Sequence, residues 1–280
     1  MPVTKQQLAR FADDQHAQLL FDTQPRYLAG PGDPRHVTHA LSAAGWTNLS
    51  DLASSQVHLT SPDHRHHLAL TPTPSTSATW WRIGTAPFSG PDNWHITFGG
   101  MAPVEIVAGL TDALIRPAPD DPPGIWHTLT AAGWTRTEDQ PCTGTGRAVS
   151  PDQLMRVEQH TMDGRSYWRA EAAQHFESGR VEPIWHAFTD DRIPQHLLSG
   201  LATALTNPAP VIRRHFDHTG HPNVSQEHSS WTAKNVVEAH ITRLDEIRAQ
   251  AHTTRRRRKL SAQPASAVVR PSATPAARSR

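Results

Sequence analysis

Histidine and carboxylate side chains gather in two stretches of the chain, and they are the first groups to consider for chemistry. The chain contains 19 histidines. One stretch holds His64, His66 and His67, and the other holds His215, Asp217, His218, His221, Glu227 and His228. Zinc or nickel binds such groups where three or more converge. Neither stretch has the spacing of a recognised metalloenzyme, so we interpret them as surface and loop histidines and keep a structural metal site as the alternative.

A nucleophile with its own base is not evident in the sequence. Cys142 is the single cysteine, which excludes an intramolecular disulfide and a cysteine-based zinc cluster. Two Ser-Pro-Asp triplets, at 61–63 and 150–152, are typical of hairpin turns, because proline fixes φ and aspartate can accept a following backbone N–H. No histidine or acid is tied to either serine by a recognised spacing. We therefore predict a protein that is not an enzyme and that needs no cofactor.

Two aromatic–arginine pairs indicate a binding surface instead. Trp80 lies two residues before Arg82, and Tyr167 lies two residues before Arg169. In a strand the members of each pair share one face, opposite the apolar residues that alternate with them. An aromatic ring beside a guanidinium on an open sheet can stack against bases or a peptide. We predict these four residues as a possible binding face, with packing on both faces of the sheet as the alternative.

The C-terminal end of the chain is strongly basic. Residues 254–280 hold eight of the 27 Lys and Arg residues and none of the 26 Asp and Glu residues, so the rest of the chain is acidic. Their Arg, Ala, Ser and Pro composition predicts a disordered tail. Five consecutive cations could contact nucleic-acid phosphates without sequence preference. They are Arg255, Arg256, Arg257, Arg258 and Lys259. The alternative is a solvated tail that aids solubility.

The elements that would position these residues occur twice. Ala-Ala-Gly-Trp-Thr is found at 43–47 and again at 131–135. In each copy a short apolar helix precedes this motif, and four strand-like stretches and a second apolar helix follow it. The strands expected in the first copy are 54–60, 66–71, 78–85 and 92–98. Alternation of apolar and polar residues is typical of an antiparallel sheet with one buried face. We predict an α+β fold of two tandem α-β-β-β-β-α units that pair about a pseudo-twofold axis.

Local signals place the ends of several elements. Asp33-Pro34 and Asp121-Pro122 should begin the first helix of each copy, and Ser230 should cap a third helix at about 231–251. Phe188 falls one residue earlier than its counterpart Phe98 requires, so its side chain should point to the opposite face of the sheet. The predicted divisions are an N-terminal helical segment (1–23), a first copy (24–119), a second copy (120–210), a His-rich linker with a C-terminal helix (211–253) and the basic tail (254–280).

Membrane and export signals are not evident. The chain has no run of about 18 apolar residues, and residues 1–10 are polar, with no apolar core. We expect a cytoplasmic protein that does not contact a membrane.

Several motifs recur in an order that resembles a known family. They are Pro-Arg-Tyr-Leu-Ala-Gly at 25–30, both Ser-Pro-Asp turns, both Gly-Trp pairs and the Trp-His pairs at 94–95 and 185–186. Over roughly residues 24–210 the chain is similar to the SPDY domain family, also called DUF317, which is typical of filamentous actinobacteria and often occurs as tandem copies. His64 and Gln153 stand where the family has tyrosine, which argues against a catalytic role for that position. The resemblance implies no activity and no site residues.

The sequence therefore favours a non-catalytic binding or scaffold protein. We expect it to recognise a protein partner through its sheets, with weak nucleic-acid contact through the tail as an accessory. The alternative is a nucleic-acid-associated protein that contacts DNA or RNA through the basic tail. A deep pocket lined by convergent polar groups would favour an enzyme.

Overall fold

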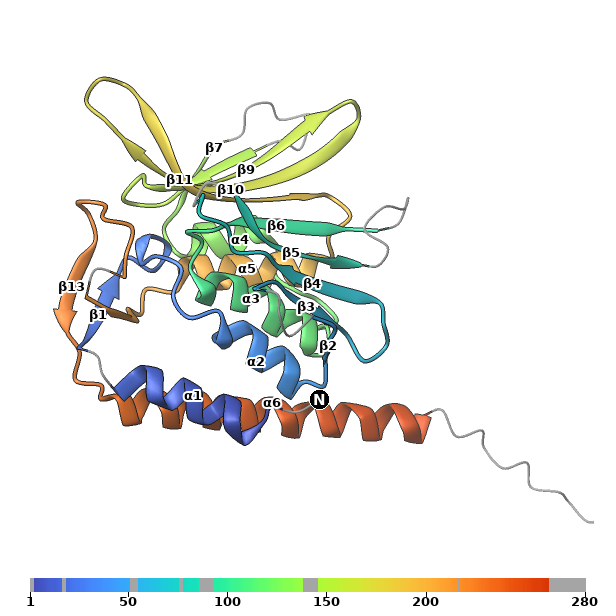
Figure 1. Ribbon diagram of the computed structural model, residues 1–280. Coiled ribbons are helices and arrows are strands. Elements are labelled where there is room, and N and C mark those ends of the chain that lie inside the picture. The colour runs from blue at the N-terminus through green and yellow to red at the C-terminus, as the bar shows by residue number, and fades with distance from the viewer. Residues whose placement is uncertain are drawn as a thin grey trace, which may run out of the picture.

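Figure 1 shows the computed structural model of the chain, in which one broad sheet lies over a layer of helices. The structure describes residues 3–16, 19–50, 55–75, 78–85, 93–137, 146–215 and 217–261. Its helices are α1 (Lys5–His16), α2 (Arg35–Ala43), α3 (Val104–Ile115), α4 (Ile125–Ala131), α5 (Gln195–Thr206) and α6 (Ala233–Ser261), with a 3-10 turn η1 at Arg26–Leu28. Helices and antiparallel sheets thus confirm the α+β class.

The large sheet contains ten strands in the order β2-β3-β4-β5-β6-β11-β10-β9-β8-β7. In the first copy they are β2 (Thr47–Asn48), β3 (Val57–Thr60), β4 (His66–Leu70), β5 (Thr79–Thr85) and β6 (His95–Gly99). In the second copy they are β7 (Thr135–Thr137), β8 (Gly146–Val149), β9 (Met155–Met162), β10 (Arg165–His175) and β11 (Val181–Asp190). Each copy therefore has five strands rather than the predicted four. The additional strands, β2 and β7, are too short to show an alternating pattern.

The two copies join about the antiparallel pair β6 and β11, where Phe98 lies opposite Ala187. The strand order is the same from each edge to this centre, so the predicted pseudo-twofold pairing is confirmed. Beneath the sheet, α3 and α5 pack against each other through Gly109 and Gly200. A Cβ atom at Gly200 would lie only 2.6 Å from the carbonyl oxygen of Gly109. One apolar core, which includes Phe98 and Trp185, extends through both copies.

Each copy turns from helix to sheet at its Gly-Trp pair. Gly45 and Gly133 have φ values of 93° and 83°, which side chains with a Cβ rarely adopt. The next backbone N–H, of Trp46 or Trp134, donates to a carbonyl of the helix, Leu41 at 3.0 Å and Leu129 at 3.1 Å. Both tryptophans are buried. The repeated motif therefore ends a helix as its C-cap and places a tryptophan side chain in the core.

Segments outside the two copies form a further layer. Strand β1 (Leu20–Gln24) pairs with β12 (Val211–Arg214) and β13 (Ser225–His228) in a three-stranded sheet. The predicted N-terminal helical segment therefore ends in a strand, and the predicted His-rich linker contains two strands. Helices α1 and α6 lie side by side below α2 (Figure 1).

Several predicted boundaries are wrong for local reasons. Helix α4 begins at Ile125 rather than at Pro122, because two prolines and a glycine separate it from Asp121. Helix α6 begins after Thr232 rather than Ser230, since Thr232 and Asn235 form reciprocal capping bonds. The same helix continues to Ser261, so predicted disorder from residue 254 is wrong for 254–261. Residues 262–280 lie outside the described part of the chain.

Within the described residues, no helix combines the length and apolar character needed to cross a membrane.

Candidate binding sites

The Ser-Pro-Asp triplets are hairpin turns, as predicted. Ser61 lies between β3 and β4, and Ser150 lies between β8 and β9. Ser150 Oγ donates to Asp152 Oδ1 at 2.6 Å and accepts the backbone N–H of Met155 at 3.0 Å. Ser61 makes the same two bonds, to Asp63 at 2.7 Å and from His66 at 3.0 Å. Both serines are engaged in holding a turn.

The position that departs from the family motif has a special backbone conformation. His64 and Gln153 follow the two aspartates and have φ values of 59° and 63°, in the left-handed region. The second turn also has a partner from outside its own copy, because the Tyr27 hydroxyl donates to Asp152 Oδ2. Burial and this aspartate raise the pKa of Tyr27. The Tyr27 carbonyl accepts the indole N–H of Trp185 at 2.7 Å, so the start of the first copy is bonded to the second.

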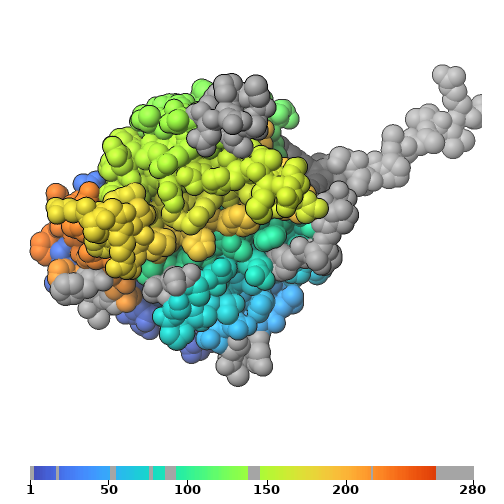
Figure 2. Space-filling view, turned by 90° about the horizontal axis from the view of Figure 1, so that it is seen from above, coloured from blue at the N-terminus to red at the C-terminus, as the bar shows by residue number. Residues whose placement is uncertain are grey.

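The upper face of the large sheet has no helix over it (Figure 1), and Figure 2 views the molecule onto this face. Tyr167 and Arg169 lie on it as predicted. Phe188 lies opposite Arg169 across the β10–β11 pair and is 39% exposed, so its predicted reversal of direction is confirmed. The rings of Tyr167 and Phe188 stack with centroids 5.5 Å apart. An aromatic pair beside a guanidinium is therefore present on this face.

Trp80 does not share the geometry of Tyr167. A β-bulge lies between Thr79 and Trp81, where the pairing with β6 shifts by one residue. Trp80 donates its indole N–H to the Ser75 carbonyl at 3.2 Å, and its ring packs against Gly100. The predicted pairing of Trp80 with Arg82 as one flat binding face is therefore wrong, because the bulge breaks the alternation on which it was based.

Basic side chains occupy matching positions on the open face of both copies. The strand registers place four such positions on the side opposite the buried residues. The matched pairs are His58 with Arg147, His67 with Arg156, Arg82 with Arg169 and His95 with His186. The four arginines are one in the first copy and three in the second, and the other four members are histidines.

Two acidic residues of the second copy lie on this face. Glu171 lies between Arg156, at 2.5 Å, and Arg169, and Glu158 lies near Arg147 at 3.5 Å. Ala69 and Gly84 occupy the matching positions in the first copy. The described strands of the first copy therefore lack these two carboxylates.

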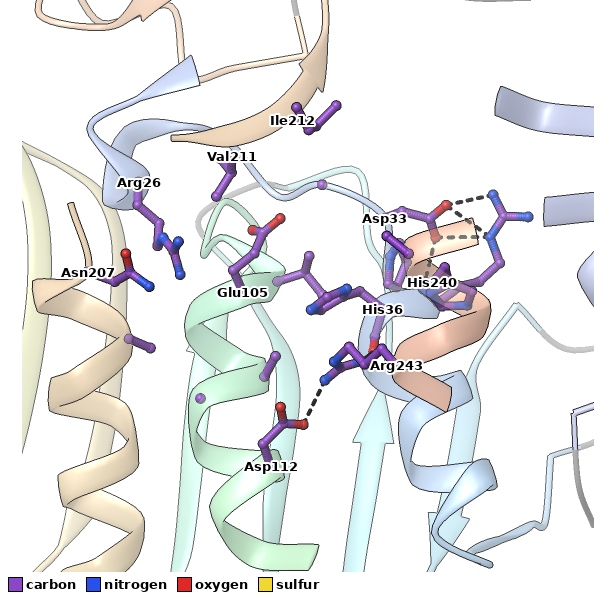
Figure 3. Close-up of a pocket in the computed structure, with 18 of the residues that line it drawn as sticks. Arg26, Asp33, His36, Glu105, Asp112, Asn207, Val211, Ile212, His240 and Arg243 are labelled. Carbon is purple, nitrogen blue, oxygen red and sulfur yellow. Dashed lines mark hydrogen bonds and ion pairs between the residues drawn. The ribbon is translucent and has the colours of Figure 1, made fainter. Parts of the chain in front are cut away.

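A polar cleft of about 1320 Å³ lies on the helical side of the molecule, between α2, α3, α5, β12 and α6 (Figure 3). Arg213 of β12 donates to both carboxylate oxygens of Glu105 at 2.8 and 2.6 Å, and its Nε donates to the Ala29 carbonyl at 3.0 Å. On another wall Arg243 donates to Asp112 at 2.7 Å. These ion pairs connect β12 and α6 to α3 and hold the cleft in shape.

Burial and charge set the protonation states in the cleft. Although burial acts in the opposite direction, Arg213 lowers the pKa of Glu105 to about 2. Burial, with the nearby charge of Arg243, lowers the pKa of His36 to about 4. At neutral pH the cleft therefore presents an ionised Glu105 and a neutral His36.

Two further histidines meet where α1, α2 and α6 converge. His39 Nδ1 and His240 Nε2 are 3.1 Å apart, and the ring of Phe11 stacks on His240 at 4.2 Å. Both histidines are buried. Burial lowers the pKa of His39 to about 4 and that of His240 to about 3. The ring that accepts this hydrogen bond must be neutral, so the contact between α2 and α6 is lost when both histidines are protonated.

Histidines of the second predicted cluster contact a phenylalanine ring or accept hydrogen bonds from the backbone. His215 and His228 pack on either side against Phe21, at centroid distances of 5.0 and 4.7 Å. His218 and His221 accept backbone N–H groups of their own turns. Among the described residues, no group of three or more His, Cys, Asp or Glu side chains is arranged to hold a metal ion.

The five consecutive cations lie on the last turns of α6 rather than on an irregular tail. The guanidinium of Arg255 occupies the space where a Cβ of Gly45 would be, at the C-terminal end of α2. The carbonyl end of a helix favours a positive charge. Arg255 therefore anchors α6 to the first Gly-Trp corner, and Arg256 is exposed beside it.

Sequence reasoning missed the cleft and the buried histidine pair. Their partners are far apart along the chain, 108 residues for Arg213 and Glu105 and 201 for His39 and His240. One signal was available for Arg213, because strand alternation places it on the same side as buried Val211. No local signal links Arg213 to Glu105.

The fold and the repeated turns place the chain among α+β proteins that are built from two tandem domains on one continuous antiparallel sheet. A family model, SPDY, a domain of unknown function (DUF317), matches residues 60–120 and 149–211. The two matched regions lie at equivalent places in the two copies, which is consistent with tandem SPDY domains, as the motif order predicted. No curated protein and no solved structure matches the chain.

Proposed function

We propose that this protein is a non-catalytic binding protein that takes an acidic protein partner on the open face of its ten-stranded sheet. The observation that carries the proposal is the repetition of basic side chains at four matched positions of the two copies. Helices cover only the opposite face of the sheet (Figure 1). A sheet face that carries cations in both copies suits a partner with carboxylates spread along its surface.

The centre of this face offers apolar contact as well. Phe188 is 39% exposed and stacks with Tyr167 beside Arg169. Aromatic and arginine side chains supply most of the binding energy at the centre of many protein interfaces. The proposed partner therefore places an apolar or aromatic side chain at Phe188 and acidic groups toward the arginines on either side, Arg82 and Arg169.

The polar cleft is the feature that would favour an enzyme, but its groups favour binding. Glu105 and Asp112 are held in ion pairs with arginines. His36, with a pKa lowered to about 4, is a weak base at neutral pH. The described lining of the cleft contains no serine, threonine or lysine in contact with these groups.

Site-specific crosslinking tests the proposed surface. A photoreactive phenylalanine analogue in place of Phe188 should capture one partner in cells, and the same analogue in place of exposed Leu19 should not. The purified partner should then bind the Arg82→Glu/Arg169→Glu variant about tenfold more weakly or worse, a loss of about 1.4 kcal/mol measured by calorimetry. The matched control is Arg180→Glu, a 70% exposed arginine on the β10–β11 hairpin. Equal affinity of both variants would rule out this face. Capture of nucleic acid by the crosslinker would show that the partner is a nucleic acid and not a protein.

A second candidate function rests on the basic end of α6. Five consecutive cations on one helical segment can neutralise several phosphates, so DNA or RNA binding would be weak, sequence-independent and strongly salt-dependent. Replacement of residues 255–259 by glutamine should abolish a gel shift seen at low salt, and removal of residues 254–280 should do the same. Binding that survives both changes would exclude this segment as the contact.

A further inference from the structure

One end of the polar cleft is rich in hydrogen-bond donors that have no acceptor. Among the described residues Arg26 makes a single hydrogen bond, from Nη2 to the Ala209 carbonyl at 3.2 Å. Its Nε is buried and has no partner. A buried donor without an acceptor costs roughly 1–3 kcal/mol, so an acceptor that enters the cleft would be favoured there.

A second donor lies at the same end, because Asn207 and Arg26 both contact the Ala209 backbone. Asn207 uses its side-chain oxygen to accept the backbone N–H of Ala209 at 2.9 Å, which leaves its amide N–H groups for the cleft. The ring of His36 makes no hydrogen bond with the described residues and lies on the other side of Glu105 (Figure 3). Arg26 and Asn207 therefore offer two donor groups to the same end of the cleft.

The local charge also favours an anion. Both oxygens of Glu105 are engaged by Arg213, whose side chain is only 3% exposed. The pair is neutral as a unit, so Arg26 adds a net positive charge at this end. By contrast, the arginines on the other walls, Arg35 and Arg243, are held by Asp33 and Asp112.

The rest of the cleft has room for an organic body. Its volume of about 1320 Å³ exceeds the range usual for small-molecule pockets, about 300–1,000 Å³. Trp231, which is 44% exposed, lines another part of it. Gly109 and Gly200, where α3 and α5 meet, are part of its lining. A ligand could therefore place its anionic end at Arg26 and its body along the α3–α5 pair.

We propose that this cleft binds a small organic molecule through an oxyanion, a carboxylate or a phosphate ester, which Arg26 holds with the amide of Asn207. This site is separate from the open face of the sheet.

Arginine side-chain NMR tests the proposal on the full chain. In a ¹⁵N-labelled sample at pH 7, the Arg26 Nε–H resonance is assigned by its loss in Arg26→Lys. Titration with succinate, inorganic phosphate and adenosine monophosphate, each separately, should shift this resonance downfield and saturate with a Kd on the order of 1 mM or tighter for at least one of them. Saturation by succinate alone indicates a carboxylate ligand, and saturation by the phosphates alone indicates a phosphate ester.

Variants separate this site from binding elsewhere. Arg26→Gln removes the bond to Ala209 and the positive charge, and it should keep the native backbone spectrum while losing the saturable shift of the Asn207 side-chain amide. The matched control, Arg82→Gln on the sheet face, should retain that shift. No saturable shift at Arg26 with any of the three probes, or an unchanged Asn207 response in Arg26→Gln, would overturn the proposal.

Discussion

Ser150 and Ser61 occupy equivalent positions in the two copies of the turn, but we expect them to contribute unequally to the free energy of unfolding. Ser150 Oγ accepts the backbone N–H of Met155, which is fully buried, whereas Ser61 Oγ accepts that of His66, which is half-buried. Ser150→Ala should lower the free energy of unfolding by about 1–3 kcal/mol, and Ser61→Ala should lower it by less, because water can reach the freed N–H. Urea unfolding of both variants measures the difference. Equal losses would show that burial of the turn is not what matters.

The His39–His240 pair predicts a dependence of stability on pH. Burial lowers both pKa values, to about 4 and about 3, so the unfolded chain binds protons before the folded one does. The stabilisation is therefore complete above the ordinary histidine pKa near 6.5 and is lost as pH falls toward 4. Between pH 7.5 and 5 the free energy of unfolding should fall by roughly 2 kcal/mol for each histidine of the pair.

Urea unfolding at several pH values measures this slope, and a double variant provides the control. His39→Asn/His240→Asn keeps a hydrogen-bonding pair that does not titrate, so its slope over the same range should be smaller. The remaining slope includes His36, whose pKa burial also lowers. A slope identical to that of the unchanged protein would assign the pH dependence to other groups.

At the scale of elements, the contact between α3 and α5 depends on two glycines. Alanine normally stabilises a helix by roughly 0.5–1 kcal/mol relative to glycine. Here a Cβ at Gly109 would lie 2.4 Å from the Cβ of Ala204 and 2.8 Å from the carbonyl oxygen of Gly200. Gly109→Ala should instead destabilise the protein by about 1–3 kcal/mol, because the helices must separate.

A second substitution makes this prediction specific. Gly109→Ala combined with Ala204→Gly removes the nearer of the two atoms and should recover part of the lost stability in urea unfolding. Stabilisation by Gly109→Ala alone would mean that the helices are less close than the structure places them.

The sequence predicted most elements because their signals are local. Alternation located β3 to β6 to within a few residues, and Gly45 and Gly133 marked both helix ends. The sequence could not predict which second face α2 buries. Val37 and Leu41 form the expected stripe toward the sheet, but His39 and Ala40 are buried against α1 and α6. That face depends on helices that precede and follow both copies, so the pattern within α2 does not reveal it.

For the whole molecule, the two copies should behave as one folding unit. They share the β6–β11 pair and the α3–α5 contact, and a single core extends through both. Differential scanning calorimetry should therefore show one transition whose calorimetric and van't Hoff enthalpies agree. Two separable transitions would show that each copy is stable alone, and then the shared core would contribute little.

Prediction of function from sequence is limited because the candidate sites combine residues from distant parts of the chain. The repetition predicted an open sheet with basic residues at Arg82 and Arg169, and the turns were identified correctly. The cleft could not be predicted, because Arg26, Glu105, Asn207 and Arg213 come from four elements spread over most of the chain. Only the pairing of β1 with β12 brings them together.

The position of Tyr27 has a consequence for how the protein is made. Its acceptor Asp152 follows it by 125 residues, and the strands that flank β1 begin at Val211 and Ser225. A nascent chain leaving the ribosome therefore carries its first segment without a place to dock until most of the protein has been synthesised. Until β11 has been synthesised, β6 is an unpaired edge strand, and an unpaired edge can pair with a strand of another chain. Native assembly is thus completed only after the last third of the chain has been synthesised. Until the second domain has emerged, the first domain must be protected from pairing with other chains.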